Sequence, residues 1–187
     1  LHDFSEVRAD WGADSIRCGI GGGSICSTRT QTGHGVPTFQ TILDIAQTDR
    51  SALIVADGGI KNSGDMVKAL AAGADLVMVG SLLAGTEQTP SEKVKVDGKV
   101  YKSYRGMASK EAQEDWRGKV SSIEGVASMV PYKGNVKHVL DELQVGIRSG
   151  LSYSGARTIG ELQARAIFIK QTSAGQMESS THIKRIA

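Results

Sequence analysis

The sequence predicts an α/β protein built on a parallel sheet. Two apolar, β-branched runs, residues 52–56 and 74–79, are each short enough to form a strand, and each is followed by a glycine-containing segment. Between them, residues 63–72 carry apolar side chains at helical spacing. A strand, a helix and a second strand at this spacing form a βαβ unit, whose strands run parallel. Runs that are apolar throughout, without alternation, predict strands buried on both faces.

The flanking segments extend this pattern in both directions. Residues 15–20 form a short apolar run that predicts a strand before the unit, and residues 40–46 have helical spacing. Helical periodicity returns over residues 135–148 and 159–168. The polar tail from residue 171 onward is expected to be loosely ordered.

The segment from residue 86 to residue 130 differs from the rest of the chain. It is polar, with patches rich in lysine and glutamate, and apolar residues are sparse beyond residue 106. Around Asp97 and Gly98, alternating side chains and an Asp-Gly turn predict a β-hairpin. Because a long polar excursion inside a compact domain is usually functional, we expect a hairpin followed by a mobile active-site flap.

Composition narrows the classes of function. Lys and Arg total 22 against 20 Asp and Glu, a balance that argues against a nucleic-acid partner. The apolar runs are far shorter than the roughly 18 residues of a membrane helix, so no membrane partner is expected. Two cysteines, Cys18 and Cys26, do not make a disulfide scaffold, and the first residues have no signal-peptide pattern. These features predict a cytoplasmic protein.

Three predicted strands end in glycine. Because the carboxyl ends of parallel strands share one edge, these glycines are expected to lie together, with backbone N–H groups free to converge on a phosphate. Ser24 and Ser81 add hydroxyl donors, whereas Asp57 only accepts hydrogen bonds and suits a ribose diol. The alternative is that the glycines only make tight turns. The strand ends are residues 21–24, 57–59 and 80–81.

Cys26 directly follows the first glycine cluster and is a candidate nucleophile. Arg29 and the hydroxyl of Thr28 lie close by in sequence, and a thiolate needs positive charge or donors of this kind. The alternative is a small apolar side chain that packs the loop. Cys18 lies inside a predicted strand and is expected to be an inert core residue, and His34 is expected to be a loop residue rather than a catalytic partner.

Residues 19–29, which read GIGGGSICSTR, resemble the IMP dehydrogenase/GMP reductase family. The resemblance covers roughly residues 8–180 and implies a (β/α)8 TIM barrel, a fold that takes about 250 residues. Residues 1–187 would then be a partial catalytic domain: the last three strands, the C-terminal helices and the flap within residues 86–130. The resemblance continues through residues 56–60, 64–65, 73–75, 79–81, 104–107, 124–125 and 130–134.

The resemblance also implies roles for matching positions. Cys26 would add to C2 of a purine mononucleotide, with Thr28 and Glu124 as its catalytic partners. Carbonyl groups of Gly21, Gly23 and Cys26 match those that bind a monovalent cation, potassium, in the dehydrogenases, although Gly22 replaces the family's usual proline. The residues implied in binding the phosphate, ribose and base are Ser24, Asp57, Gly59, Gly80, Ser81, Tyr104, Gly106 and Met107.

The resemblance leaves two reactions open. The dehydrogenases of this family carry an Arg-Tyr pair in the flap, and residues 107–124 contain none. This favours reductive deamination of GMP to IMP with NADPH, in which Glu124 would handle the proton as ammonia leaves. The first alternative is oxidation of IMP to XMP with NAD, because residues 104–107 and 173–175 resemble the dehydrogenases of the family. The second is a nucleotide-binding barrel module without catalysis. Family members are usually homotetramers, so that assembly is also expected.

Overall fold

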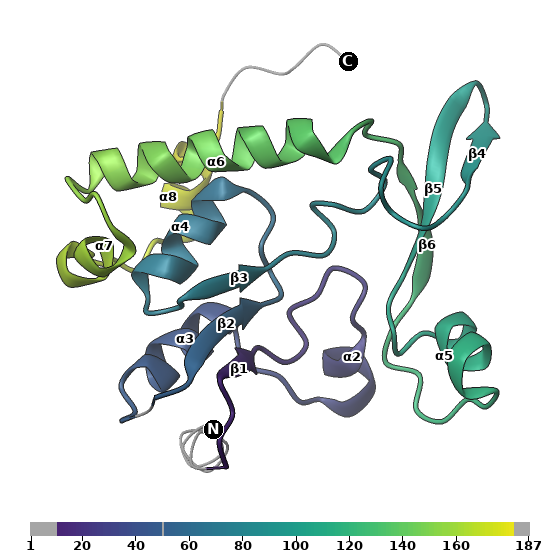
Figure 1. The fold of residues 1–187 in the computed structure, drawn as a ribbon, viewed down its shortest axis with the longest axis horizontal. Coiled ribbons are helices and arrows are strands. Elements are labelled where there is room, and N and C mark those ends of the chain that lie inside the picture. Colours follow the sequence, from purple (N-terminus) through teal and green to yellow (C-terminus); the bar gives the residue numbers. More distant parts are fainter. Residues whose placement is uncertain (1–10, 50, 182–187) are drawn as a thin grey trace.

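A computed structural model describes residues 11–49 and 51–181 (Figure 1). Within these residues, two three-stranded sheets form the framework. The first sheet is parallel and has the order β1 (Ser15–Cys18), β2 (Leu53–Asp57) and β3 (Leu76–Met78). The second is antiparallel and has the order β4 (Lys93–Val96), β5 (Lys99–Arg105) and β6 (Ala127–Pro131).

Helices α3 and α4 pack on one face of the parallel sheet. Figure 1 shows the long helix α6 lying across α4 and shows α2 between the two sheets. The predicted strand–helix–strand unit is confirmed, and the tail predicted to be loose contains a short helix, α8. The helices are α2 (Thr28–Thr32), α3 (Thr38–Ala46), α4 (Ser63–Ala71), α5 (Lys110–Arg117), α6 (Val136–Tyr153), α7 (Ile159–Arg165) and α8 (Ser173–Glu178).

The parallel sheet has one buried face and one open face. Ile54 and Ala56 on β2 are fully buried in a core that α3 and α4 share with the sheet. On the opposite face, Leu53 is 46% exposed and Leu76 is 50% exposed. The prediction of strands buried on both faces is therefore wrong for the described residues, where helices cover only one face.

The start of α4 also corrects a local expectation. The sequence analysis placed this helix over residues 63–72, and Ser63 at its start is of a residue type that commonly caps helices. In the structure, the cap is Asn62, whose side-chain oxygen accepts the backbone N–H of Asp65 at 2.9 Å. Asn and Ser are about equally good caps, so sequence preference alone does not separate them.

The segment 86–130 contains the predicted hairpin and more secondary structure than expected. Asp97 and Gly98 have φ values of +48° and +79°, the left-handed pair that a tight two-residue hairpin turn requires. Beyond the hairpin, the structure adds helix α5 and strand β6, which the sequence analysis did not predict. Helix α5 begins where the Ser109 hydroxyl accepts the Ala112 N–H. Its sequence is almost entirely polar, so apolar periodicity could not reveal it.

Candidate active site

The ends of β1 and β2 lie against each other through glycine backbone. A Cβ atom added at Gly19 would lie 2.0 Å from the carbonyl oxygen of Asp57, and one at Gly58 would lie 3.0 Å from the carbonyl carbon of Gly22. Any larger side chain at these positions would force the two loops apart. The prediction that these glycine-ended strands meet at one edge is confirmed for this pair.

The third strand end is met by the antiparallel sheet. After β3, the carbonyl of Gly80 accepts the N–H groups of Leu83 and Ala84 at 3.0 and 3.1 Å, which folds the chain into a tight turn. A Cβ at Gly80 would lie 3.0 Å from the hydroxyl oxygen of Tyr104 on β5. Two predicted binding residues, far apart in sequence, are therefore neighbours.

The cysteine loop pairs with the far end of the flap segment. Cys26 forms an antiparallel bridge with Gly125, and the Ser27 N–H donates to the carbonyl of Glu124 at 2.9 Å. A Cβ at Gly125 would lie 2.9 Å from the backbone nitrogen of Ser109, so this crossing also needs glycine. The pairing carries the Glu124 side chain to the cysteine loop.

Cys26, Thr28 and Glu124 form a chain of hydrogen-bonding groups. The Cys26 thiol is exposed and donates to the Thr28 hydroxyl, with 3.2 Å between Sγ and Oγ1. Hydrogen bonds from Thr28 and, second in importance, from Ser122 lower the pKa of Glu124 below its ordinary value of 4.5. The Ser122 hydroxyl lies 2.9 Å from Glu124 Oε1. The sequence analysis did not identify Ser122, which has no motif around it.

Arg29 is anchored to the base of the same loop. Its aliphatic part fills the space beside Gly21 and Gly35, where an added Cβ would lie 2.6 and 2.7 Å from Arg29 Cγ. Its guanidinium donates to the carbonyl of Val36 at 3.0 Å. The hydrogen bond of Arg29 therefore braces the loop, whereas the sequence suggested a charge beside the Cys26 thiol.

The remaining predicted residues lie at the end of β2, just after β5 and in the loops that follow the parallel strands. Asp57 is partly buried and pairs with Arg17, while Met107 is 69% exposed. A Cβ at Gly106 would lie 3.5 Å from the side chain of Ile25, which places this residue against the cysteine loop. Others lie in the glycine-rich loops after the strands: Gly21, Gly23, Ser24, Gly59 and Ser81.

Lys133 is a further residue that the sequence analysis did not assign. Its side-chain Nζ donates to the carbonyl oxygens of Ser81 and Leu82, at 2.9 and 3.1 Å. Burial lowers the pKa of this ammonium group. In the sequence, Lys133 stood out only as part of residues 130–134, which resemble the family, and the resemblance implied no role for it.

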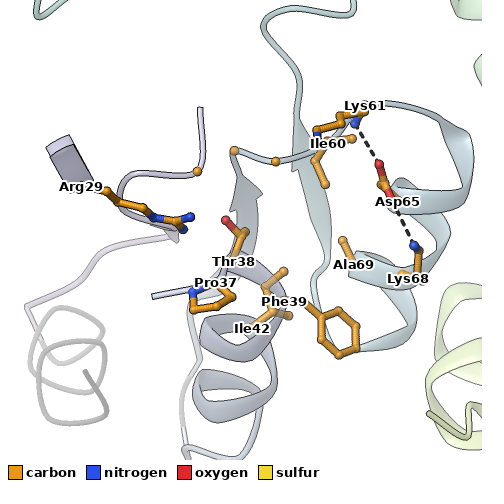
Figure 2. Close-up of a pocket in the computed structure, with 13 residues that line it drawn as sticks. Arg29, Pro37, Thr38, Phe39, Ile42, Ile60, Lys61, Asp65, Lys68 and Ala69 are labelled. Carbon is orange, nitrogen blue, oxygen red and sulfur yellow. Dashed lines mark hydrogen bonds and ion pairs between the residues drawn. The ribbon is translucent and has the colours of Figure 1, made fainter. Parts of the chain in front are cut away.

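A cavity of about 380 Å³ lies behind the first two strand ends, between α3 and α4. A Cβ added at Gly22 would lie 2.6 Å from the hydroxyl oxygen of Thr38. Figure 2 shows Asp65 between Lys61 and Lys68. Of the residues predicted for the site, Gly59 alone lines this cavity. The cavity therefore adjoins the glycine loops on their helix side and does not contain the cysteine.

The fit of a monovalent cation to the cysteine loop is incomplete. Backbone carbonyls are suitable ligands for potassium. However, the carbonyl of Gly23 already accepts the Cys26 N–H at 3.2 Å, which uses one of its two lone pairs. Within residues 11–49 and 51–181, no group of three or more His, Cys, Asp or Glu side chains could hold a metal. In the same residues, no helix is long and apolar enough to cross a bilayer.

Fold and site together define an α/β domain that presents a cysteine, a hydroxyl and a carboxylate beside glycine-ended parallel strands. The chain belongs to the IMP dehydrogenase/GMP reductase domain family, whose sequence model matches residues 4–182. The predicted family is therefore confirmed, and so is the α/β fold with a parallel sheet.

Known relatives carry both names of the family. The chain is 46% identical over 185 residues to an inosine-5′-monophosphate dehydrogenase from Nitrosopumilus maritimus, covering 91% of this chain and 39% of that protein. It is 47% identical over 189 residues to the Aquifex aeolicus enzyme of the same name, covering 95% and 39%. A solved GMP reductase from Trypanosoma brucei, in complex with guanosine 5′-monophosphate, is 40% identical with a TM-score of 0.93. That match covers 98% of this chain and 39% of the solved chain.

Proposed function

We propose that this chain is part of a purine nucleotide oxidoreductase that reduces GMP to IMP with NADPH. The observation that carries the proposal is the hydrogen-bonded series from the Cys26 thiol through the Thr28 hydroxyl to the Glu124 carboxylate. A module that only bound nucleotides would have no need of a thiol aligned with a proton acceptor. The chain spans 39% of the length of the two dehydrogenases and of the solved GMP reductase described above, so the activity is proposed for the whole protein.

The ionised state of Glu124 gives the series its direction, because a carboxylate can accept a proton but has none to donate. At neutral pH the carboxylate is ionised and accepts the proton of Thr28, while the Thr28 oxygen accepts the proton of the Cys26 thiol. Movement of both protons leaves a thiolate and a protonated Glu124. The thiolate is the nucleophilic form of cysteine.

The thiolate then forms a C–S bond to C2 of the purine. The same series works in reverse: Glu124 returns its proton through Thr28 to the amino group at C2, the C–N bond breaks and ammonia leaves. The product is a covalent thioimidate between Cys26 and the purine. When bound, NADPH supplies the hydride that replaces sulfur at C2 and releases IMP with the Cys26 thiolate. Because the side chains of Cys26 and Met107 are exposed, a purine bound against them would be open to the cofactor, as this transfer requires.

The three strand ends provide the binding part of the proposal. The backbone and hydroxyl donors of Ser24, Gly59, Gly80 and Ser81, with the Tyr104 hydroxyl beside Gly80, would hold the 5′-phosphate. Asp57 would accept the ribose hydroxyls, and Gly106 and Met107 would meet the base. Anchoring the phosphate orients C2 over Cys26, which converts binding energy into reactive geometry.

The open face of the parallel sheet supports a closed barrel. Leu53, Leu76 and Met78 are 42–50% exposed on the face away from α3 and α4. In a (β/α)8 barrel, that face would be the packed interior, completed by the other strands.

We include in the proposal a homotetramer and a potassium ion on the carbonyls of Gly21, Gly23 and Cys26, but no chemical step depends on either.

A second reaction, oxidation of IMP with NAD, is supported by the names of the two dehydrogenases that are 46% and 47% identical. One assay separates the two. The full-length protein is incubated with GMP and NADPH, or with IMP and NAD, and the absorbance of the reduced nicotinamide is followed. Loss of absorbance with GMP supports the proposal, and a gain with IMP supports the dehydrogenase. No change in either mixture supports a non-catalytic module.

A further inference from the structure

The turn that follows β3 has a backbone orientation that can be read from its hydrogen bonds. The Gly80 carbonyl points into the turn, where it accepts the N–H groups of Leu83 and Ala84. Because a trans peptide unit is planar, its N–H points opposite to its C=O. The N–H of Ser81 therefore points out of the turn, on the side where a phosphate would lie.

Lys133 fixes the next two peptide units of the same turn. Its Nζ donates to the Ser81 carbonyl at 2.9 Å and to the Leu82 carbonyl at 3.1 Å. By the same planarity, holding the Ser81 carbonyl directs the Leu82 N–H away from the lysine. Holding the Leu82 carbonyl directs the Leu83 N–H toward Gly80, where its hydrogen bond is found at 3.0 Å.

The main chain around Lys133 holds it in place beneath the turn. The Lys133 N–H donates to the Gly85 carbonyl at 2.9 Å, and the Glu87 N–H donates to the Gly134 carbonyl at 2.7 Å. Lys133 follows β6 closely, and its neighbour β5 carries Tyr104 to Gly80. The antiparallel sheet thus contacts this strand end from two adjacent strands.

We propose that Lys133 is a positioning residue that shapes the strand end at Gly80 and Ser81 to bind a phosphate monoester. The inference deepens the proposed function and rests on it. Both hydrogen bonds of the ammonium group go to neutral carbonyls, so they leave its positive charge uncompensated. Because the ammonium group occupies the carbonyl side of the turn, the Leu82 N–H on the opposite side is left for the phosphate.

The test compares a nucleotide with its nucleoside, which lacks the phosphate. The full-length protein, Lys133→Met and Lys133→Arg are titrated with GMP and with guanosine by calorimetry. Lys133→Met is expected to weaken GMP binding about tenfold or more, because misplacing a binding group by about 1 Å costs up to about a hundredfold. Its affinity for guanosine should change less than about twofold, since a neutral ligand makes no use of the oriented amides.

The conservative variant and a matched control complete the design. Lys133→Arg keeps the positive charge on a side chain of different length and shape. It should therefore bind GMP more tightly than Lys133→Met does, but less tightly than the wild type. Lys137→Met removes a positive charge four residues away, where Lys137 pairs with Asp141 on α6 at 2.5 Å, and should leave both affinities unchanged. In steady-state assays, Lys133→Met should raise KM for GMP far more than it lowers kcat.

Equal losses for GMP and guanosine in Lys133→Met, or no loss for either, would overturn the inference. If circular dichroism shows that Lys133→Met is unfolded, Lys133→Arg decides: a preference for GMP over guanosine equal to that of the wild type overturns the inference, and a reduced one supports it. Failure of the proposed function looks different. In that case the wild-type protein itself binds GMP no more tightly than guanosine.

Discussion

Arg17 on β1 and Asp57 at the end of β2 form an ion pair, with 2.9 Å between Arg17 Nε and Asp57 Oδ2. The two strands pair in parallel, with Cys18 opposite Ala56, so both charged side chains lie on the open face of the sheet. The Arg17 side chain is 65% exposed, and exposed pairs contribute little to stability. The pair orients the Asp57 carboxylate: it engages Oδ2, and under the proposed function the other oxygen would accept a hydrogen bond from the ribose.

Asp57→Asn should weaken ribonucleotide binding because a neutral amide oxygen accepts a ribose hydroxyl more weakly than a carboxylate oxygen does. We expect about a tenfold loss of affinity for GMP, since a hydrogen bond to a charged group is worth about 1.5–3 kcal/mol. The measurement is calorimetric titration of both proteins with GMP and with 2′,3′-dideoxy-GMP. The dideoxynucleotide should bind the variant and the wild type alike. If the variant loses affinity for both ligands equally, Asp57 does not bind the ribose.

Cys26→Ala should abolish turnover and keep nucleotide affinity. The thiol would form the covalent bond to the purine, whereas the phosphate and ribose groups would be held by other residues. Steady-state assays and titration with the nucleotide measure the two properties separately. Cys18→Ala is the matched control, because Cys18 is buried in the core at 3% exposure and should affect stability rather than chemistry. Parallel loss of binding and turnover in Cys26→Ala would indicate a structural role.

Ser122→Ala should move the acidic limb of the pH–rate profile upward. The Ser122 hydrogen bond is one of two that lower the pKa of Glu124, so its removal lets that pKa rise toward the ordinary value of 4.5. The working form is the carboxylate, which is lost as pH falls through the pKa. The variant should therefore lose kcat/KM at a higher pH than the wild type, and circular dichroism should confirm that both remain folded.

Glu124→Gln is the companion to that experiment. It should lower kcat by about 10²–10⁴, the usual contribution of a positioned general acid–base group, and its acidic limb should disappear. Thr28→Ala removes the largest cause of the lowered pKa and should shift the limb further than Ser122→Ala does. An unshifted profile in all three variants would mean that Glu124 does not titrate in the reaction.

Gly150→Ala should destabilise the protein where α6 crosses α4. An added Cβ would lie 2.6 Å from Cγ2 of Val67, and overpacking of this kind costs about 1–3 kcal/mol. Gly160→Ala, in α7, is the control: nothing lies within 4 Å of its Cβ, and replacing a helical glycine gains about 0.5–1 kcal/mol. Urea unfolding measures both, and equal effects would contradict the close contact between α4 and α6.

Local features of this protein followed from its sequence because their causes are local. The βαβ unit was predicted from apolar runs and glycines, and the hairpin at Asp97 and Gly98 from a turn whose dihedral angles few other residues adopt. The juxtaposition of the first two strand ends followed from the rule that parallel strands end on one edge. The roles of Thr28 and Glu124 came from family resemblance, and their proximity was found only in the structure.

The tertiary structure decided which distant groups meet. Pairing of the cysteine loop with Gly125 brings Glu124 to Thr28, and the two adjacent strands β5 and β6 bring Tyr104 and Lys133 to the end of β3. Helix α5 is polar, and the partner of Asp57 lies on another strand, so neither has a periodic or motif signal. Secondary structure reflects short-range preferences, whereas these contacts depend on the register and crossing of segments far apart in the chain.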